Sequence, residues 1–581
     1  MDIEQWRIHV LEPLRNGQKP TADVTALGGL ALLAADTDRT QDYVFESAKL
    51  PEVRGASRQL DDLNLCSTIA LFRDCGLSGR FVDDTPPGEI VYAGGGGLLA
   101  LVPEEQARAL AQAIEAEYPK VTGAATITAD WRPVTPEMVL NGYPDGGFGG
   151  LARWAGNWLR QRKEDKSPGP FFEALPHAVR CRSCHIRPAD PHASFGDWPL
   201  CTICKDKRIY EGRDAWFVQF QEFLDEPANA PVKAQYYSDR QSIPSGWPDW
   251  DEASPRPIPQ DLSELGWASR ARKGYVGLIY LDGDGLGDLF YELTKMSCYR
   301  DFSKQIQQTL KHAVMSALAA YLHPARVRAS EARAEVGEKP APGEWVWIHP
   351  FEIITIGGDD VWLIVPGDAA LPIAAAVSTA FSKKAPPRPD NGEPCTLSGG
   401  VVIADDHNPV RVLRDLAKDL AREAKRAHQE ASVEIGYIDF HIFKSADMLD
   451  RKLSTLRQTY PYTLPAGEKS LRLLGRPYPS DVLTGLWLAL QELRKNDFPT
   501  SQMHQLAEAL LLGRHRSSLF YEYQRVRDTE DHFVRLDAAL TVAQGNREID
   551  PTPWRKLCDD RYSHQTALWD IAEVYEFVSR T

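Results

Sequence analysis

Two adjacent carboxylates stand where two strongly apolar strands should meet. In EIITIGGDDVWLIV, residues 352–365, the β-branched and aromatic residues on both sides favour buried strands. Between them, Gly357 and Gly358 permit the tight turn of a hairpin, because glycine adopts φ values that other residues resist. The hairpin tip would therefore carry Asp359 and Asp360, which must be solvated or paired.

A second acidic pair ends another apolar strand. In YVGLIYLDGDGLGDLF, residues 275–290, the strand runs into Asp282 and Asp284. If this strand neighbours the hairpin in a small antiparallel sheet, the carboxylates converge and repel one another unless cations neutralise them. Mg²⁺ or Mn²⁺ accepts oxygen ligands, and the phosphates of a nucleotide would complete the coordination. The alternative is an ordinary acidic turn, because Asp and Gly are common turn residues.

A basic helix is predicted further along the chain. In RVLRDLAKDLAREAKRA, leucines and alanines recur at spacings of three and four, which is typical of an amphipathic helix. Its opposite face would carry a basic stripe that could meet phosphates, and the alternative is a solvated helix face. The stripe consists of Arg411, Arg414, Lys418, Arg422 and Lys425.

The same order of elements occurs earlier in the chain. An apolar strand ends at Asp36 and Asp38, and EIVYAGGGGLLALVP at residues 89–103 repeats the strand–glycine–strand pattern. An amphipathic helix over 104–118 and a further strand follow, as they do after the GGDD segment. The sequence therefore predicts one β-α-β-hairpin-α-β unit in two copies, with GGGG in the first where the second has GGDD.

Two CxxC pairs lie between the copies. Cys181 and Cys184 are followed, after sixteen residues, by Cys201 and Cys204. Four thiolates at this spacing can close a tetrahedral Zn²⁺ site, and four protein ligands leave no open position, so the predicted role of the zinc is structural. The alternative is four unrelated buried cysteines.

Bulk composition limits the setting. A chain of 581 residues, 43% apolar and 25% charged, is long enough for three or four globular domains. The N-terminus has no signal-peptide pattern, and no window is apolar enough to span a membrane, so we expect a cytoplasmic protein without membrane contact. Nine cysteines fit a reducing compartment. The net charge of −15 argues against free, non-specific nucleic-acid binding, but not against a nucleic acid held by other subunits.

Together these motifs resemble the large Palm-domain subunit of type III CRISPR-Cas effector complexes. That family is related to GGDEF-type nucleotide cyclases and to the palms of family B-like polymerases. The resemblance covers most of the chain and implies synthesis of cyclic oligoadenylates from ATP, in antiviral defence, when the guide RNA of the complex pairs with target RNA. The implied partners are ATP, the other effector subunits, guide RNA and target RNA.

The resemblance also assigns roles to residues. It implies that Asp282, Asp359 and Asp360 are catalytic ligands of Mg²⁺ or Mn²⁺. The dipeptide Ala424-Lys425 falls where the cyclase relatives carry a phosphate-binding lysine. The expected nucleotide contacts are Gly357, Gly358, Asp284, Lys425, Gly94 and Gly95.

Two departures from the family pattern bear on activity. Many family members begin with a histidine–aspartate nuclease domain, whereas here about 25 residues without such a pair precede the first palm, so we expect no cleavage of single-stranded DNA. The first palm has Gly94–Gly97 in place of GGDD. We expect that copy to bind a nucleotide through its backbone and to hold metal poorly.

The predicted fold class is α+β and multidomain, with two ferredoxin-like palms of the GGDEF cyclase type. Because the palms are tethered in one chain, we expect activity without a homodimer. Two other readings stay open, a free-standing cyclase that makes a cyclic dinucleotide or another adenylated product, and a catalytically silent scaffold. The expected boundaries are an N-terminal helix at 1–25, palm one at 26–150, a linker and zinc-binding domain at 151–272, palm two at 273–445 and an α-helical C-terminal domain at 446–581.

Overall fold

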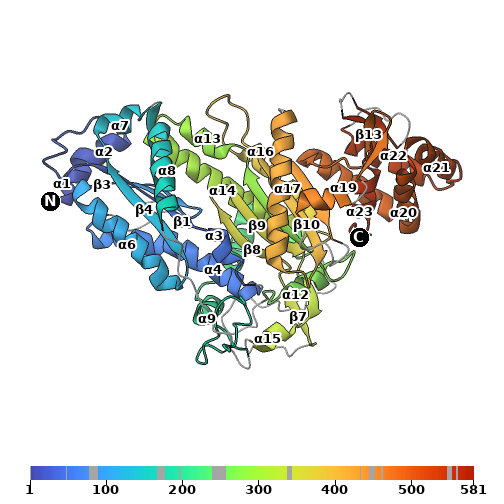
Figure 1. Ribbon diagram of the computed structural model, residues 1–581, viewed down its shortest axis with the longest axis horizontal. Helices are drawn as coiled ribbons and strands as arrows, with labels where there is room; N and C mark the ends of the chain where they lie inside the picture. Colours follow the sequence, from blue (N-terminus) through green and yellow to red (C-terminus); the bar gives the residue numbers. More distant parts are fainter. Residues whose placement is uncertain are drawn as a thin grey trace.

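The structure of the chain is a computed structural model. It describes all residues except 1, 48, 78–88, 145, 167–176, 195–197, 239–256, 336–342, 432–433, 444–451, 460–461, 546–552, 558–560 and 581. The molecule is elongated, with palm one at one end, palm two in the middle and the C-terminal segment at the other end (Figure 1). None of the helices in the described ranges is both long and apolar enough to cross a membrane.

Palm one is a four-stranded antiparallel sheet in the order β2-β3-β1-β4. This is the ferredoxin-like arrangement that the duplicated pattern predicts. The strands are β1 (Ala31–Asp38), β2 (Ile90–Gly94), β3 (Gly97–Val102) and β4 (Thr126–Pro133). The helices are α1 (Ile3–Trp6), α2 (Glu12–Arg15), α3 (Thr40–Val44), α4 (Leu50–Asp62), α5 (Thr68–Asp74), α6 (Glu104–Thr122), α7 (Pro136–Asn141) and α8 (Gly147–Asp165).

Palm two repeats this order and extends it. Its sheet runs β14-β11-β10-β5-β9-β8, so the four strands from β10 to β8 match β4-β1-β3-β2 of palm one. The strands are β5 (Tyr275–Gly283), β8 (Glu352–Gly357), β9 (Asp360–Pro366), β10 (Leu397–Asp405), β11 (Tyr437–Ile442) and β14 (Tyr478–Pro479). Its helices are α13 (Leu286–Tyr291), α14 (Met296–Tyr321), α16 (Ala370–Lys384) and α17 (Val410–Ala431).

One part of palm two departs from its sequence pattern. The periodicity predicts a helical region from Asp301 to about Glu335, but α14 ends at Tyr321. Pro324 disfavours a helical conformation for the residue before it. After α14 the chain forms β6 (Ala325–Arg328), α15 (Glu331–Glu335) and β7 (Trp345–Ile348), with β6 and β7 paired antiparallel.

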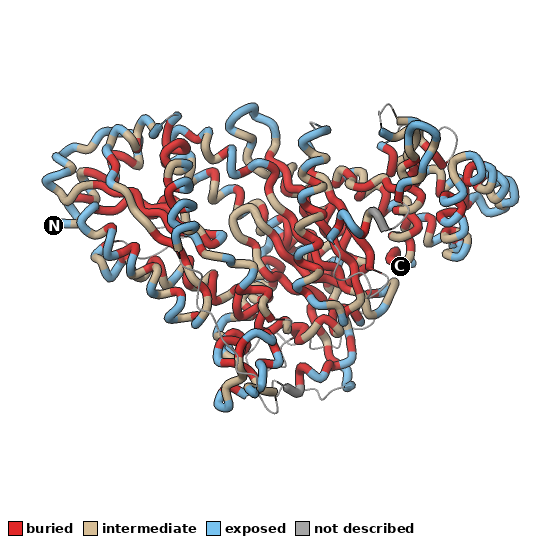
Figure 2. Tube along the Cα trace, viewed as in Figure 1, coloured by how far each residue is buried: buried red, intermediate tan, exposed pale blue. Residues whose placement is uncertain are grey.

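The two palms share one core. Alternate residues of each sheet belong to a single buried cluster, which contains Leu33 of β1 and Trp362 of β9. Helix α4 of palm one packs against β8 of palm two within this cluster, while α14 and α16 cover the opposite face of the palm two sheet. The buried trace is accordingly continuous from one sheet to the other (Figure 2). Because the palms pack against each other in this way, the tips of the β2–β3 and β8–β9 hairpins lie next to each other.

The segment between the palms does not form one compact unit, because its helices pack on different parts of the two palms. Helix α8 covers the palm one sheet, the cysteine region with α9 (Thr202–Ile209) packs on α4, and α11 (Ala230–Tyr236) packs on α14. Helices α10 (Ala215–Asp225) and α12 (Leu262–Ala268) complete the described part of the segment.

The C-terminal segment is mainly helical, as predicted, but it also carries a small sheet. The helices are α18 (Leu453–Thr459), α19 (Ser480–Lys495), α20 (Thr500–Ala509), α21 (Arg514–Val526), α22 (His532–Ala543) and α23 (Leu568–Tyr575). The sheet has the order β12-β13-β16-β15, with β12 (Thr463–Ala466), β13 (Lys469–Arg472), β15 (Arg555–Lys556) and β16 (Tyr562–Gln565). These strands have only two to four residues, too few for a period-two pattern to show.

Candidate active site

Three aspartates meet at the edge of the palm two sheet. Strand β5 pairs with β9 in the register Leu281↔Val361, which sets Asp282 beside Asp360. The tight turn between β8 and β9 adds Asp359, and one carboxylate oxygen from each residue lies within 4.8 Å of the others. The structure therefore forms the carboxylate cluster that the two motifs predict, and we use that name for Asp282, Asp359 and Asp360.

Burial and nearby negative charge raise the pKa of Asp359 and of Asp360 in the cluster. Burial and the charge of Asp282 raise the pKa of Asp359 to about 6. Burial and the charges of Asp282 and Asp359 raise the pKa of Asp360 well above its ordinary value, although the Tyr280 hydroxyl donates to Oδ1 of Asp360 at 3.0 Å and opposes the shift. Carboxylates that resist ionising together are the environment in which a divalent cation binds favourably.

Lys425 lies at the cluster, as expected from its place in α17. Its Nζ contacts the Asp282 carboxylate and donates to the carbonyl of Gly283 at 2.8 Å. Helix α17 packs on β5 and β10 through its apolar face, which aims this part of the basic stripe at the cluster. Lys425 is therefore a cation already held against one of the carboxylates.

The structure does not bring Asp284 to the carboxylate cluster. The chain leaves β5 at Gly283, and the Asp284 side chain is buried, with Oδ2 accepting hydrogen bonds from Thr396 at 2.8 Å and Ser398 at 2.9 Å. Burial raises the pKa of this carboxyl. These contacts join the end of β5 to β10. The nucleotide contact predicted for Asp284 stays a prediction without a structural contact to support it.

A pocket of about 360 Å³ lies between the palms, beside the carboxylate cluster. Palm one contributes α3, α4 and the tip of the β2–β3 hairpin, and palm two contributes β8, β9 and Lys418 of α17. We call it the interpalm pocket. Its wall includes Phe45 and Trp362, whose rings meet edge to face at 5.3 Å. The polar and glycine lining is Arg39, Thr40, Gln41, Asp42, Ser57, Asp61, Asn64, Gly95, Gly96, Thr355, Gly357, Asp360 and Lys418.

The two glycine hairpins touch at this pocket. A β-carbon built on Gly357 would lie 3.3 Å from the Cα of Gly95, and one built on Gly95 would lie 3.4 Å from the amide nitrogen of Gly358. Gly95 also has φ +59°, a conformation that glycine adopts without strain. Of the four glycines expected to contact nucleotide, Gly95 and Gly357 line the pocket, whereas Gly94 and Gly358 do not.

Palm one keeps its strand aspartates but pairs them with lysines. Lys163 of α8 contacts Asp36 at 2.7 Å and Asp38 at 3.3 Å, and Lys166 contacts Asp38 at 3.4 Å. Burial raises the pKa of Asp38, but hydrogen bonds from Thr128 and Thr126 and the charges of both lysines hold it below its ordinary value. Protein cations thus neutralise the carboxylates that correspond to Asp282 and Asp284.

Several pocket residues were not singled out as site residues from the sequence. Lys418 belongs to the predicted basic stripe and lines the pocket beside Asp360, and neighbouring Arg414 donates to Asp42 at 3.2 Å, tying α17 to palm one. Gln41 and Asp42 follow the first acidic strand, but nothing in their local pattern indicates that α3 faces palm two. Only the packing of one palm on the other brings them to the site.

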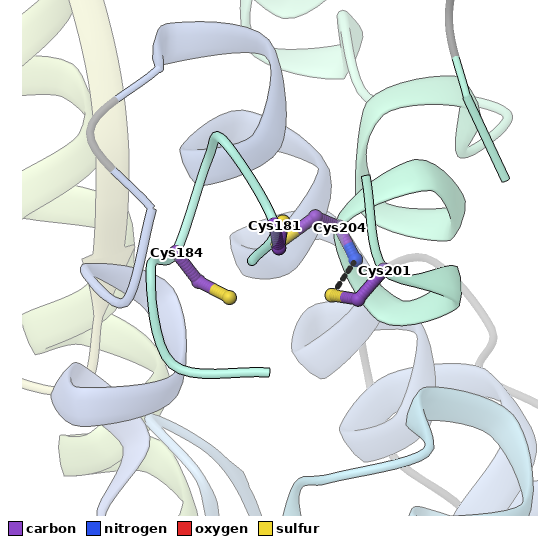
Figure 3. A group of neighbouring side chains, drawn as sticks. All are labelled: Cys181, Cys184, Cys201 and Cys204. Atoms are coloured by element: carbon purple, nitrogen blue, oxygen red, sulfur yellow. Dashed lines mark hydrogen bonds between the residues drawn. The ribbon is translucent and has the colours of Figure 1, made fainter. Parts of the chain in front are cut away.

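The four cysteines form one buried cluster. Their sulfurs lie within 4.8 Å of one another, and Figure 3 shows the side chains of both CxxC pairs converging. Sγ of Cys201 accepts a hydrogen bond from the amide of Cys204 at 3.4 Å, and Arg187 donates to Sγ of Cys184 at 3.9 Å. These residues fit the four-thiolate metal site that the spacing predicts.

Helix α4 links this cysteine region to palm two. A β-carbon on Gly55 would lie 1.7 Å from the carbonyl oxygen of Lys207, so α4 and α9 are in backbone contact. On its other side, the buried Arg54 donates to Glu352 at the start of β8 (2.9 Å) and to Asp214 (3.2 Å). Strand β8, which ends in the hairpin that carries Asp359 and Asp360, is therefore anchored at its first residue.

Comparison with known proteins agrees with this architecture. Residues 275–433 match the family model for the second palm domain of Cas10/Cmr2. Among solved structures, Csm1 of T. onnurineus has a TM-score of 0.53 at 15% identity, over 95% of this chain and 70% of that chain. A Csm1–Csm4 cassette in complex with cA4 has a TM-score of 0.52 at 13% identity, with the same coverage. The cassette in complex with pppApA has a TM-score of 0.50 at 14% identity, over 95% of this chain and 69% of that chain.

No curated protein sequence matches the chain significantly. The structural likeness, at these identities, concerns the fold, while the family match covers palm two with its carboxylate cluster and Lys425. Residues 275–433 thus match the second palm domain of Cas10/Cmr2, in a chain whose overall fold is similar to that of Csm1.

Proposed function

We propose that this chain polymerises ATP into cyclic oligoadenylates as the large subunit of a type III CRISPR effector complex. The observation that carries the proposal is the carboxylate cluster of palm two, which opens on a pocket that both palms build. Structures of similar fold were solved as Csm1–Csm4 cassettes in complex with cA4 and with pppApA. A pocket shared by two nucleotide-binding units suits a reaction that joins two nucleotides.

The carboxylate cluster would hold Mg²⁺ or Mn²⁺ through Asp282, Asp359 and Asp360, because hard cations prefer oxygen ligands and relieve the crowding of these charges. When bound, the metal lowers the cost of deprotonating a ribose 3′-hydroxyl and neutralises charge on the attacked α-phosphate.

The chain's own residues would position the two nucleotides. Lys425 contacts Asp282 of the cluster, Lys418 lines the interpalm pocket together with Asp360, and both lysines would contact phosphates. In the pocket wall, the indole N–H of Trp362 and the amide oxygen of Gln41 are buried without hydrogen-bond partners in the described part of the chain. They offer one donor and one acceptor to the edge of a base. Contact between the glycine tips would hold the two nucleotides close together.

The cysteine cluster would hold one structural Zn²⁺ per chain. Four buried thiolates leave no coordination position for a substrate. Elemental analysis should find one zinc per chain, and a Cys181→Ser/Cys201→Ser variant should lose both the zinc and thermal stability. A zinc-free preparation of unchanged stability would show that the cluster is not a metal site.

Mass spectrometry of the reaction product tests the proposed activity. The full chain would be incubated with Mg²⁺ and equimolar ATP, GTP, CTP and UTP, alone and together with the other effector subunits, guide RNA and target RNA. We expect cyclic oligomers of AMP that depend on target RNA and disappear in the Asp359→Asn/Asp360→Asn variant. A cyclic dinucleotide made by the chain alone would indicate a free-standing cyclase, and no product under any condition would indicate a scaffold.

A further inference from the structure

The β6–β7 hairpin of palm two has one apolar and one charged, aromatic face. Because strand residues alternate, Val327, Val346 and Ile348 point into a small buried cluster with Ala329. The opposite face carries two cross-strand pairs, each an arginine opposite a tryptophan. These pairs are Arg326 with Trp347 and Arg328 with Trp345. We call this face the Arg–Trp ribbon.

The ribbon presents planar groups to solvent. The Arg328 guanidinium lies 4.1 Å from the ring centroid of Trp345, and that of Arg326 lies 5.1 Å away. Trp345 is nevertheless 49% exposed, so the arginines do not cover it. Cross-strand cation–π pairs stabilise a hairpin, but that role alone does not need an uncovered indole.

A pocket of about 480 Å³ adjoins the ribbon and, like the ribbon, is lined by aromatic and basic side chains. Arg326 and Trp347 of the ribbon line it, together with the exposed Trp267, Arg270 and Lys273. Among the described residues that line it, Asp368 is the one carboxylate, and its Oδ2 accepts hydrogen bonds from the backbone amides of Arg270 at 2.6 Å and Ala271 at 3.0 Å. The surface is therefore locally basic on a chain whose net charge is −15.

This surface is separate from the candidate active site. The pocket reaches Pro366 and Asp368, at the far end of β9, whereas Asp360 of the carboxylate cluster begins that strand. A strand rises about 3.3 Å per residue, so the two sites are roughly 20 Å apart. In Figure 1, strand β7 lies near the lower edge of the molecule, below β8 and β9.

We propose that the Arg–Trp ribbon and its pocket bind a short stretch of single-stranded nucleic acid. Exposed indoles stack on bases of any sequence, and arginine and lysine contact the phosphates between them, which is how single strands are bound without base-specific hydrogen bonds. The pocket volume suits one nucleotide, and the ribbon beside it extends the surface to its neighbours. The site goes beyond the proposed ATP chemistry and does not depend on it.

Fluorescence anisotropy of the full chain with a fluorescein-labelled single-stranded RNA of about ten nucleotides tests this site. The test variants are Trp345→Ala and Arg326→Ala/Arg328→Ala, all at exposed positions. Arg132→Ala is the matched control, because Arg132 also lies over an indole, that of Trp158 at 5.1 Å, but belongs to palm one.

We expect Trp345→Ala to weaken RNA binding about tenfold, since stacking supplies much of the affinity per base. The arginine pair variant should also reduce the slope of log Kd against log salt by about 1.4, because single strands release about 0.7 counterion per phosphate contact. The Arg132→Ala control should bind as the unaltered chain does. Equal weakening in all variants, or in none, would overturn the proposal.

Two further experiments locate the bound RNA on the chain and distinguish RNA binding from ATP binding at this site. Photo-crosslinking with 4-thiouridine RNA should label peptides that contain β6, β7 or Trp267. Excess ATP, which should occupy the interpalm pocket, should not displace the RNA. If ATP binds with the same dependence on Trp345 and displaces the RNA fully, the site is a mononucleotide site and the single-strand proposal is wrong.

Discussion

At the scale of single residues, protons should compete with the proposed metal ion for the carboxylate cluster. The pKa of Asp359 is raised to about 6, so the folded chain binds more protons here than the unfolded chain does. The contribution of Asp359 to the free energy of unfolding is fully present below the ordinary aspartate pKa of about 4 and is lost as the pH rises through 6. We expect urea unfolding in EDTA to show falling stability between pH 4 and 7.

Asp359→Asn should flatten that part of the stability profile, because asparagine does not titrate. Mg²⁺ should restore stability most at pH 7 and above, since it binds only the ionised cluster. An unchanged profile in the variant, or a Mg²⁺ effect that is the same at pH 5 and pH 8, would contradict this account of the cluster.

Lys425 should be a competitor of the metal until ATP arrives, since its ammonium contacts Asp282. We predict that Lys425→Met tightens Mn²⁺ binding to the ATP-free chain by about twofold to fivefold, the range for a partly exposed ion pair. The same change should lower kcat/KM for ATP by about tenfold, because a charged phosphate contact is lost.

Calorimetric titration with Mn²⁺ and steady-state kinetics measure the two effects. Arg422→Met on the same helix is the matched control, since its side chain is 72% exposed and pairs with Asp419. If both variants bind Mn²⁺ alike, Lys425 does not compete for the site.

At the scale of elements, the contact between the two hairpin tips is the feature most open to test. Gly95→Val would force a β-branched residue to φ +59° and place its side chain against Gly357 and Gly358. We expect synthesis to fall at least about tenfold, with backbone strain of about 1–3 kcal/mol. Mn²⁺ binding to palm two should persist, because no ligand changes.

Gly467→Val controls for strain alone. Gly467 has φ +68° in the turn between β12 and β13, and a β-carbon there meets nothing within 4 Å. The rate of product formation is measured in both variants, and we expect it to fall in Gly95→Val but not in Gly467→Val. Normal turnover by Gly95→Val would show that palm one does not take part through its hairpin.

Elements were predictable from the sequence where the pattern was long or repeated. The hairpins of both palms, the helix after each, and β4 and β10 occur where the duplicated pattern predicts them. The β6–β7 hairpin and the C-terminal sheet were not predicted, because strands of two to four residues leave no periodic pattern.

At the scale of the whole molecule, the two palms share a core, so one chain supplies both sides of the interpalm pocket. A tether replaces an encounter between two molecules with a high effective concentration. We predict that the rate is first order in protein. Mixtures of unaltered chain with the Asp359→Asn/Asp360→Asn variant should have activity proportional to the unaltered chain. Specific activity that rises steeply with concentration, or variant chains that poison the mixture, would mean that two chains form the site.

Site residues were predictable only where chemistry lies in a short motif. The GGDD aspartates, Asp282 and the four cysteines are brought together as their spacing predicts. Asp284 is two residues from Asp282, yet its side chain is buried against β10. The lysine that neutralises Asp36 comes from α8, more than a hundred residues away, and its role appears only once that helix packs on the sheet.

We propose that, of the two palms, only palm two binds the metal used in nucleotide polymerisation, and the same substitution can be made at the corresponding aspartate of each palm to test this. Asp282 and Asp36 occupy corresponding positions near the ends of β5 and β1, but Asp282 belongs to the carboxylate cluster, whereas Asp36 contacts Lys163. Incorporation of α-labelled ATP into product would be measured for Asp282→Asn and Asp36→Asn in the assembled complex with target RNA. We predict that Asp282→Asn abolishes incorporation while Asp36→Asn changes it less than about threefold, since an exposed ion pair contributes little. Loss of incorporation in Asp36→Asn, with retention in Asp282→Asn, would contradict it.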